Sequence, residues 1–121
     1  MSNVLEGVHY FESILDTVGK TPLVRLRAVA RDLPCPVLAK METFNPGGSV
    51  KDRIARHILD RAEASGKLRS DSTILEVTSG NTGIAMSMVG AEKGYRVRIM
   101  MPASEGWPLS SSWCAIVSSL S

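Results

Sequence analysis

The chain has 121 residues, of which 44% are hydrophobic and 21% are charged, and its formal net charge is +2. This length is enough for one modest domain with a core, and the composition is typical of a globular protein. Aromatic residues make up only 5% of the chain, so we expect no nucleic-acid surface. We expect no membrane contact, because no apolar run approaches the roughly 18 residues of a membrane span.

The remaining whole-chain features point to the cytoplasm. The first residues lack the basic and apolar regions of a secretory signal. Cys35 and Cys114 show neither metal-ligand spacing nor a CxxC pair. Reduced, unpaired thiols are the expected state of such cysteines in a cytoplasmic protein.

The first third of the chain contains one predicted helix and two predicted strands. Residues 8–18 carry apolar side chains at helical spacing, and Gly19 supplies a stop. Residues 21–26 alternate apolar and basic side chains after Pro22, which predicts a short strand. A turn-rich joint follows, and residues 37–43 form the second strand candidate.

The middle of the chain predicts a strand–helix–strand unit. A helix over 50–66 can be capped by Ser49 and ended by Gly66. The pattern then predicts a strand at 72–78, a loop at 79–83, a helix at 84–94 and a strand at 95–102. A strand, helix and strand in this order predict a right-handed crossover with parallel strands. The predicted fold class is therefore α/β, with a mostly parallel open sheet flanked by helices.

Two glycine-containing loops each follow a predicted strand and lead into a predicted helix. We expect them on adjacent units of one sheet, at the carboxyl edge where open α/β folds bind ligands. Glycines let backbone N–H groups approach a ligand, and helix N-termini favour negative charge. The loops thus predict a small anionic ligand such as a carboxylate or phosphate. Their polar and glycine residues are Asn45, Gly47, Gly48, Ser49 and Lys51, then Thr78, Ser79, Gly80, Asn81, Thr82 and Gly83.

Lys51 stands where a cation is unfavourable. An ammonium group in the first turn of a helix opposes the helix dipole by about 0.3–1 kcal/mol, and burial disfavours its charge further. Both effects favour the neutral amine, the form that attacks carbonyl carbons. Taken alone, each loop is more typical of a plain turn and cap, and the spacing of a nucleotide-binding P-loop is missing. The combination of the two loops is what indicates a site.

Three segments together resemble the N-terminal part of cysteine synthase (O-acetylserine sulfhydrylase) and of its relative cystathionine β-synthase. They read ILDTVGKTPLVRL, FNPGGSVKDRIA and EVTSGNTGIAM, and the resemblance runs from about residue 8 to Pro102. It implies the tryptophan-synthase-β-like fold of enzymes that depend on pyridoxal 5′-phosphate (PLP), known as fold type II. This chain would represent the N-terminal third of that fold.

The resemblance also implies the roles of individual residues. Lys51 would link covalently to the PLP aldehyde and later move the α-proton of the substrate. Asn81 would hydrogen-bond the 3′-oxygen of the cofactor. The loop formed by Thr78, Ser79, Gly80, Asn81 and Thr82 would grip the carboxylate of the amino-acid substrate. No metal is implied, and the entry residues Lys20, Thr21 and Pro22 are interpreted as scaffold.

The implied reaction belongs to cysteine biosynthesis. O-acetylserine and sulfide would give cysteine and acetate, a transferase or lyase reaction on a small amino acid. The alternatives are a cystathionine β-synthase reaction, which joins serine and homocysteine, and a non-catalytic remnant. An unrelated anion-binding α/β domain is a third alternative, which the combined motifs disfavour. For the full-length family a homodimer is implied.

The resemblance stops near residue 103. The segment 104–121 is rich in serine, contains Gly106 and Pro108, and shows no sustained helical or strand period. We interpret residues 1–103 as the N-terminal part of a cysteine synthase-like domain and residues 104–121 as a divergent or frameshifted tail. The PLP phosphate loop of the family would lie further downstream. We therefore expect little or no turnover from this chain.

Overall fold

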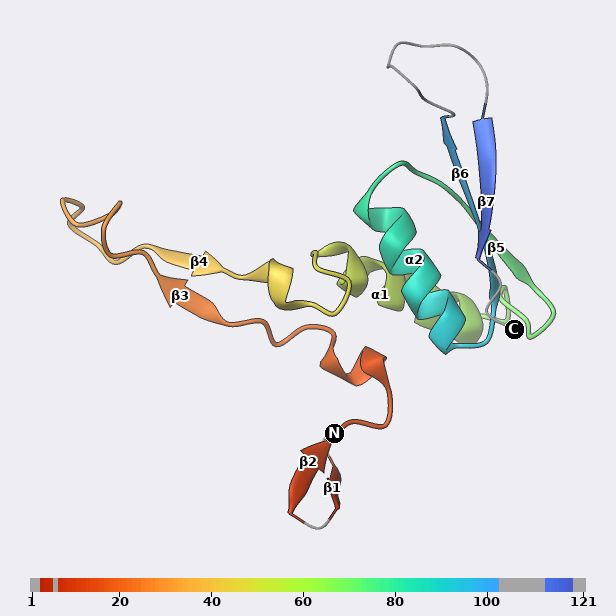
Figure 1. Cartoon of the computed structure of the whole chain (residues 1–121), viewed down its shortest axis with the longest axis horizontal. Coiled ribbons are helices and arrows are strands. Elements are labelled where there is room, and N and C mark those ends of the chain that lie inside the picture. Colours follow the sequence, from red (N-terminus) through yellow and green to blue (C-terminus); the bar gives the residue numbers. More distant parts are fainter. Residues whose placement is uncertain (1–2, 6, 103–112, 119–121) are drawn as a thin grey trace.

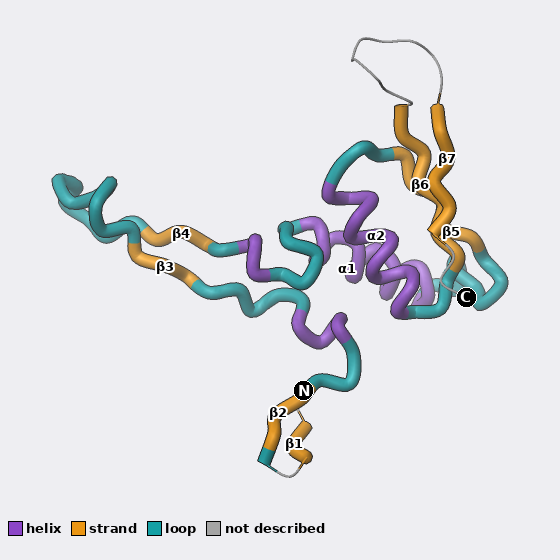
Figure 2. Tube along the Cα trace, in the orientation of Figure 1, coloured by secondary structure: helices purple, strands orange, loops and turns teal. Residues whose placement is uncertain are grey.

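The computed structural model describes residues 3–5, 7–102 and 113–118. Figure 1 shows the longer helices lying side by side next to a small sheet, with a hairpin extending away from them and another near the N-terminus. Figure 2 shows that loops join most of these elements. The predicted α/β class is confirmed. The elements are, in order, β1 (Asn3–Leu5), β2 (Val8–Tyr10), the 3-10 helix η1 (Ile14–Thr17), β3 (Leu23–Arg25), β4 (Leu38–Lys40), the 3-10 helix η2 (Glu42–Phe44), α1 (Lys51–Ala64), β5 (Thr73–Val77), α2 (Asn81–Glu92), β6 (Arg96–Pro102) and β7 (Trp113–Ser118).

The predicted strand–helix–strand unit is present. Strands β5 and β6 pair in parallel, from Thr73 opposite Arg96 to Val77 opposite Met100, and α2 connects them. The prediction of a mostly parallel sheet is wrong, because this is the one parallel pair among the described strands. Strand β7 pairs antiparallel to β6, while β3 and β4 pair with each other in a separate antiparallel hairpin.

The strand β7 also differs from the sequence-based expectation, which gave the tail no regular period. Its backbone follows β6 from Pro102 opposite Trp113 to Val97 opposite Ser118. Residues 103–112 and 119–121 of the predicted tail lie outside the described residues. The strand forms where β6 offers an unpaired edge, a feature that the tail's own composition does not reveal.

The expectation that the two glycine loops lie on adjacent units of one sheet is wrong. Strand β4 precedes the first loop and β5 precedes the second, and these strands belong to different sheets. The link between the two loops is instead helical, because α1 and α2 pack against each other. In Figure 1 both helices begin on the same side of the pair.

The predicted helix over residues 8–18 is also wrong. Its first residues form β2, which pairs with β1, and its later residues form only the short helix η1. Leu15 is buried, but Phe11 and Ile14 remain exposed. A short helix gains most of its stability from a packed apolar face, which this segment lacks. The Ser13 hydroxyl accepts a hydrogen bond from the Leu15 N–H at 3.1 Å and caps the turn that forms instead.

The core lies where α2 packs on α1 and on β6. It contains Leu15, Ala55, Leu59, Ala85, Met86, Val89, Val97 and Ile99. Gly90 allows the close approach of α2 to β6, because a Cβ atom there would overlap the Val97 side chain and lie 3.3 Å from Ile74 Cδ1. On α1, Leu59 faces this core, whereas the apolar Ile54 and Ile58 remain exposed.

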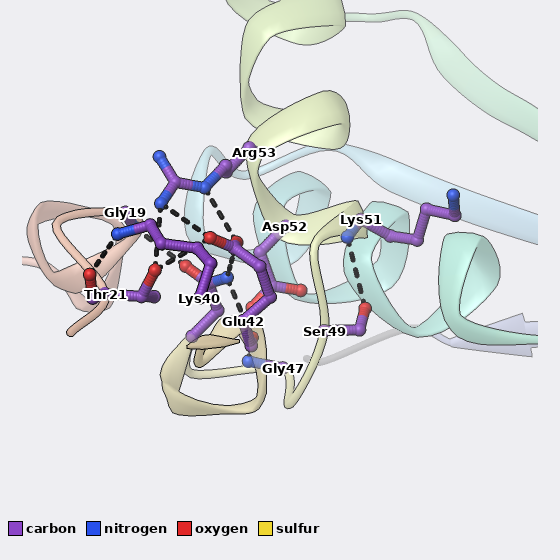
Figure 3. Close-up of polar contacts among 10 residues, drawn as sticks. Gly19, Thr21, Lys40, Glu42, Gly47, Ser49, Lys51, Asp52 and Arg53 are labelled. Carbon is purple, nitrogen blue, oxygen red and sulfur yellow. Dashed lines mark hydrogen bonds and ion pairs between the residues drawn. The ribbon is translucent and has the colours of Figure 1, made fainter. Parts of the chain in front are cut away.

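A polar network joins the entry segment (Lys20, Thr21 and Pro22), η2 and α1 (Figure 3). The Glu42 carboxylate accepts hydrogen bonds from Thr21 Oγ1 at 2.7 Å and from Asn45 Nδ2 at 2.8 Å. Arg53 adds two more, from its Nε at 2.8 Å and from a terminal nitrogen at 3.0 Å. Hydrogen bonds from Arg53 and Thr21 lower the pKa of Glu42 from 4.5 to about 2. Thr21 is buried, which supports its interpretation as scaffold.

A second network ties the end of α1 to the end of α2. Lys93 Nζ lies 2.6 Å from Glu63 Oε2 and 2.8 Å from Asp60 Oδ1, and the Tyr95 hydroxyl donates to Glu63 Oε1 at 2.8 Å. The hydrogen bonds with Asp60 and Glu63 raise the pKa of Lys93, and the one from Lys93 lowers the pKa of Glu63. Together the two networks hold α1 at both ends.

We expect Gly90→Ala to lower the free energy of unfolding by about 1–2 kcal/mol. Alanine gains roughly 1 kcal/mol of helix propensity, but forcing a methyl group onto Val97 costs more. Urea unfolding measures the difference. Glu92→Ala, at an exposed site on the same helix, is the control and is expected to change stability by less than about 0.5 kcal/mol. Equal or higher stability of Gly90→Ala contradicts the close packing described here.

We expect Glu42→Gln to make stability less sensitive to acid. The folded pKa of about 2 lies below the ordinary 4.5, so folding favours ionised Glu42. The stability that ionised Glu42 contributes is fully present above pH 4.5 and is lost as the pH falls toward 2. The variant should therefore be less stable than the wild type near neutral pH and lose less stability in that acidic range. Urea unfolding across pH measures this, with the exposed Glu92→Gln as control; a parallel loss in both proteins would refute it.

Candidate active site

The turn between η2 and α1 is held from the inside by buried side chains. Asn45 is buried, and its Oδ1 accepts the Gly19 N–H at 2.8 Å, so its amide serves the scaffold and does not face a ligand. Gly48 adopts a left-handed conformation with φ of 79° and donates its N–H to the Asn45 carbonyl at 2.8 Å. Buried Ser49 accepts the Lys51 N–H at 3.2 Å, but it is not the cap residue as predicted, because Val50 takes that position without a side-chain cap.

Lys51 is the first residue of α1, and its side chain is half-buried. Figure 3 shows this side chain extending away from the Glu42–Arg53 network. Within the described part of the chain, the Lys51 amine has no hydrogen-bond or ion-pair partner. A lysine whose backbone is fixed and whose amine is unpaired is available for reaction with a carbonyl group.

The second loop differs from the first because it is open. Helix α2 already begins at Asn81, so Asn81, Thr82 and Gly83 lie in its first turn and not in the predicted loop. No side chain caps this N-terminus, where Gly80 is the cap residue. A Cβ atom on Gly80 would meet nothing within 4 Å, so its backbone faces open space. An uncapped N-terminus with open access suits a negatively charged group.

A cavity of about 460 Å³ lies beside this N-terminus. Its lining includes the predicted Thr78, Ser79 and Gly80, together with Gly83, Ile84, Ser87, Ile99 and Met101. Lys51, Asn81 and Thr82 are not part of this lining as the described residues define it. The structure thus brings three of the predicted residues to one cavity. It places Lys51 and Asn81 at the starts of two contacting helices.

Sequence reasoning missed the residues that support Lys51. Glu42 and Arg53 are separated by ten residues and come from a 3-10 helix and an α-helix, so no local spacing marks them as a pair. Asp52 directly follows Lys51 and is fully buried. The helical spacing of Asp52 with the apolar Ala55 and Leu59, which are also buried, is the signal that could have predicted its burial.

The described ranges give no sign of a metal centre or a membrane span. They contain no group of three or more His, Cys, Asp or Glu side chains that could hold a metal ion. No helix in them is long and apolar enough to cross a membrane. Cys35 carries an exposed free thiol, and the Cys114 side chain lies outside the described part.

Comparison with known proteins identifies close relatives of most of the chain. The family model "Pyridoxal-phosphate dependent enzyme" matches residues 14–106. A cystathionine beta-synthase from Dictyostelium discoideum is 50% identical over 91 residues, which are 75% of this chain and 18% of that protein. Cysteine synthase B from Pseudomonas syringae pv. syringae is 49% identical over 92 residues, which are 76% of this chain and 54% of that protein.

A solved structure shows the same likeness in three dimensions. The hydrogen sulfide-producing enzyme from Fusobacterium nucleatum superimposes with a TM-score of 0.75 at 39% identity. The match covers 80% of this chain and 32% of the enzyme. The chain therefore spans between about a fifth and about half of the length of these relatives.

Proposed function

This chain belongs to the family of pyridoxal-phosphate-dependent enzymes, and we propose that Lys51 is the residue that bonds covalently to the PLP aldehyde. The observation that carries the proposal is the unpaired amine of Lys51 on a turn fixed by buried polar groups. The relatives named above support the choice, because they match the segments around Lys51 and around Asn81. A nucleophilic amine needs a rigid backbone and a free lone pair, and this turn supplies the first.

We propose complementary roles for the second loop. Asn81, at the first position of α2, would donate to the 3′-oxygen of the cofactor. Thr78, Ser79, Gly80 and Thr82 would bind the carboxylate of an amino-acid substrate. The uncapped N-terminus of α2 and the open space at Gly80 support this assignment, because backbone N–H groups there can receive a negative charge.

The reaction proposed for the complete site is a β-replacement of the cysteine synthase type. Bound PLP supplies an electron sink that stabilises negative charge on the substrate's α-carbon. Lys51 would move the proton at that carbon, and the second loop would hold the carboxylate so that the leaving group departs from O-acetylserine. Sulfide would then add to give cysteine and acetate. The 50% identity to a cystathionine beta-synthase favours serine and homocysteine as the second candidate pair.

We propose that this chain alone turns over little substrate, or is a non-catalytic remnant. It spans only part of its relatives, and the open cavity beside α2 would admit water. A small amino acid is its proposed ligand, and homodimer formation is proposed for full-length members. The exposed thiol of Cys35 suits a reducing compartment, so we place the protein in the cytoplasm.

We expect PLP to label Lys51 selectively. The chain is incubated with PLP, reduced with borohydride to fix the cofactor on any reacting amine, and digested for mass spectrometry. Lys51 should carry more label than the exposed Lys67, because its side chain is half-buried on a turn that buried polar groups fix. A visible absorbance band on adding PLP should accompany the label.

Two variants make this measurement decisive. Lys51→Ala should abolish the absorbance band, while Lys67→Ala, which removes an exposed lysine side chain, should leave it unchanged. Equal labelling of Lys51 and Lys67, or a band that survives in Lys51→Ala, would remove the basis for a PLP function.

We also propose that residues 104–121 are a divergent or frameshifted tail, although the family match extends three residues into this segment, to residue 106. The abrupt loss of charge after Ile99, where Glu105 is the only charged residue, supports this boundary. Reading the coding DNA in its other two frames downstream of residue 103 tests it. A charged, helix-forming segment in one of those frames is the expected result, and its absence from both would refute the frameshift.

A further inference from the structure

Asp52 is buried in an unusual manner for a carboxylate. Its relative exposure is 0%, and it occupies the second position of α1, next to Lys51. Its Oδ2 accepts a hydrogen bond from the Gly47 N–H at 2.5 Å. Its Oδ1 is the one buried side-chain oxygen or nitrogen without a hydrogen-bond partner among the described residues. Burying an ionised group with an unpaired oxygen costs free energy, which the positive end of the α1 dipole only partly offsets.

The fit between Asp52 and Gly47 leaves no room for another side chain. A Cβ atom on residue 47 would overlap Asp52 Oδ1 and lie 2.9 Å from both Cγ and Oδ2. The carboxylate therefore fixes the Gly47 backbone by a hydrogen bond and by direct contact. Only glycine at position 47 permits this arrangement.

Gly47 begins the backbone that leads directly to Lys51. The next residue, Gly48, takes the left-handed turn, and Ser49 then accepts the Lys51 N–H. The hydrogen bond between the Asp52 side chain on α1 and the Gly47 N–H therefore joins the two ends of the turn formed by residues 47–52. Figure 3 shows Asp52 directed toward Gly47 and the Lys51 side chain directed away from both. The two neighbouring side chains thus face opposite sides of the first helical turn.

We propose that Asp52 is the positioning residue for Lys51. It holds the 47–52 turn in one conformation, and that conformation aims the Lys51 amine at its carbonyl partner. Asp52 itself contacts no reacting atom. The inference rests on the proposed function of Lys51, but it concerns a separate residue and a separate contact.

The test measures the rate at which PLP labels Lys51 in the 121-residue chain. Borohydride trapping and mass spectrometry give the rate at Lys51 and, as an internal reference, at Lys67. Asp52→Ala removes the contact with Gly47. We expect its rate at Lys51 to fall by about tenfold to a hundredfold, the scale of a misplaced reactive group, with no change at Lys67. Asp52→Asn keeps an acceptor for the Gly47 N–H, so most of the wild-type rate should return.

Gly47→Ala perturbs the same contact from its other side. Its methyl group would push on the Asp52 carboxylate, so Lys51 should again lose rate selectively. In the double variant with Asp52→Ala the methyl group gains space, and the combined loss should be smaller than the product of the single losses. This non-additivity identifies the shared contact. Gly47→Ala decides the question if Asp52→Ala proves unfolded by circular dichroism.

The possible failures are distinguishable. If wild-type Lys51 reacts no faster than Lys67, the proposed function is lost and this inference with it. If wild-type Lys51 reacts selectively but Asp52→Ala or Gly47→Ala reacts at the same rate, the function stands and the positioning role of Asp52 is overturned. A general change at Lys51 and Lys67 alike would show a loss of fold and would also count against a specific role.

Discussion

The Glu42 carboxylate joins three segments that would otherwise be separate. It accepts hydrogen bonds from Thr21 in the entry segment, from Asn45 in the turn and from Arg53 on α1. Its low pKa reflects how strongly these donors favour the ionised form. The hairpin β3–β4 pairs only with itself, and an isolated two-stranded hairpin is marginally stable in water. Glu42 lies two residues after the end of β4, so this network ties the hairpin and the Lys51 turn to the helices.

The two glycine loops have similar compositions, but the polar side chains of the first are buried and those of the second are exposed. In the first, Asn45, Ser49 and Asp52 are buried and satisfy backbone N–H groups from within the protein. In the second, Ser79, Gly80 and Asn81 are exposed, and no side chain caps the helix. A closed loop suits the exact aim that a nucleophile needs, whereas an open one leaves donors for a ligand. The division of roles proposed for Lys51 and the Thr78–Thr82 loop rests on this contrast.

Local patterns in the sequence predicted the elements that carry their own signals. The strand at β5, the helix α2 and the strand β6 were found because turn residues bound each one and an apolar pattern fills it. The helix expected at 8–18 failed because periodicity alone does not show whether a face will be covered, and Phe11 and Ile14 are not. The separate β3–β4 hairpin was missed because strand pairing is decided at a distance. For the site, the motifs indicated Lys51 and Asn81. They did not reveal the roles of Glu42 or Asp52, because the hydrogen bonds of these carboxylates with Arg53 and Gly47 form only in the folded turn.

The proposed reactivity of Lys51 and the proposed turnover of substrate depend on different parts of the structure. The aim of the Lys51 amine depends on residues 42–53 and on the entry segment, all of which are present and in contact. Turnover depends in addition on a dry site, because hydrogen bonds to a developing charge are stronger where water is excluded. Here Ile84 is exposed beside the uncapped N-terminus of α2, and Leu75 and Val77 are exposed on β5. The match covers 32% of the solved relative, so the described residues correspond to only part of that structure. The proposed reactivity of Lys51 with an aldehyde and the proposed turnover therefore depend on different parts of the site.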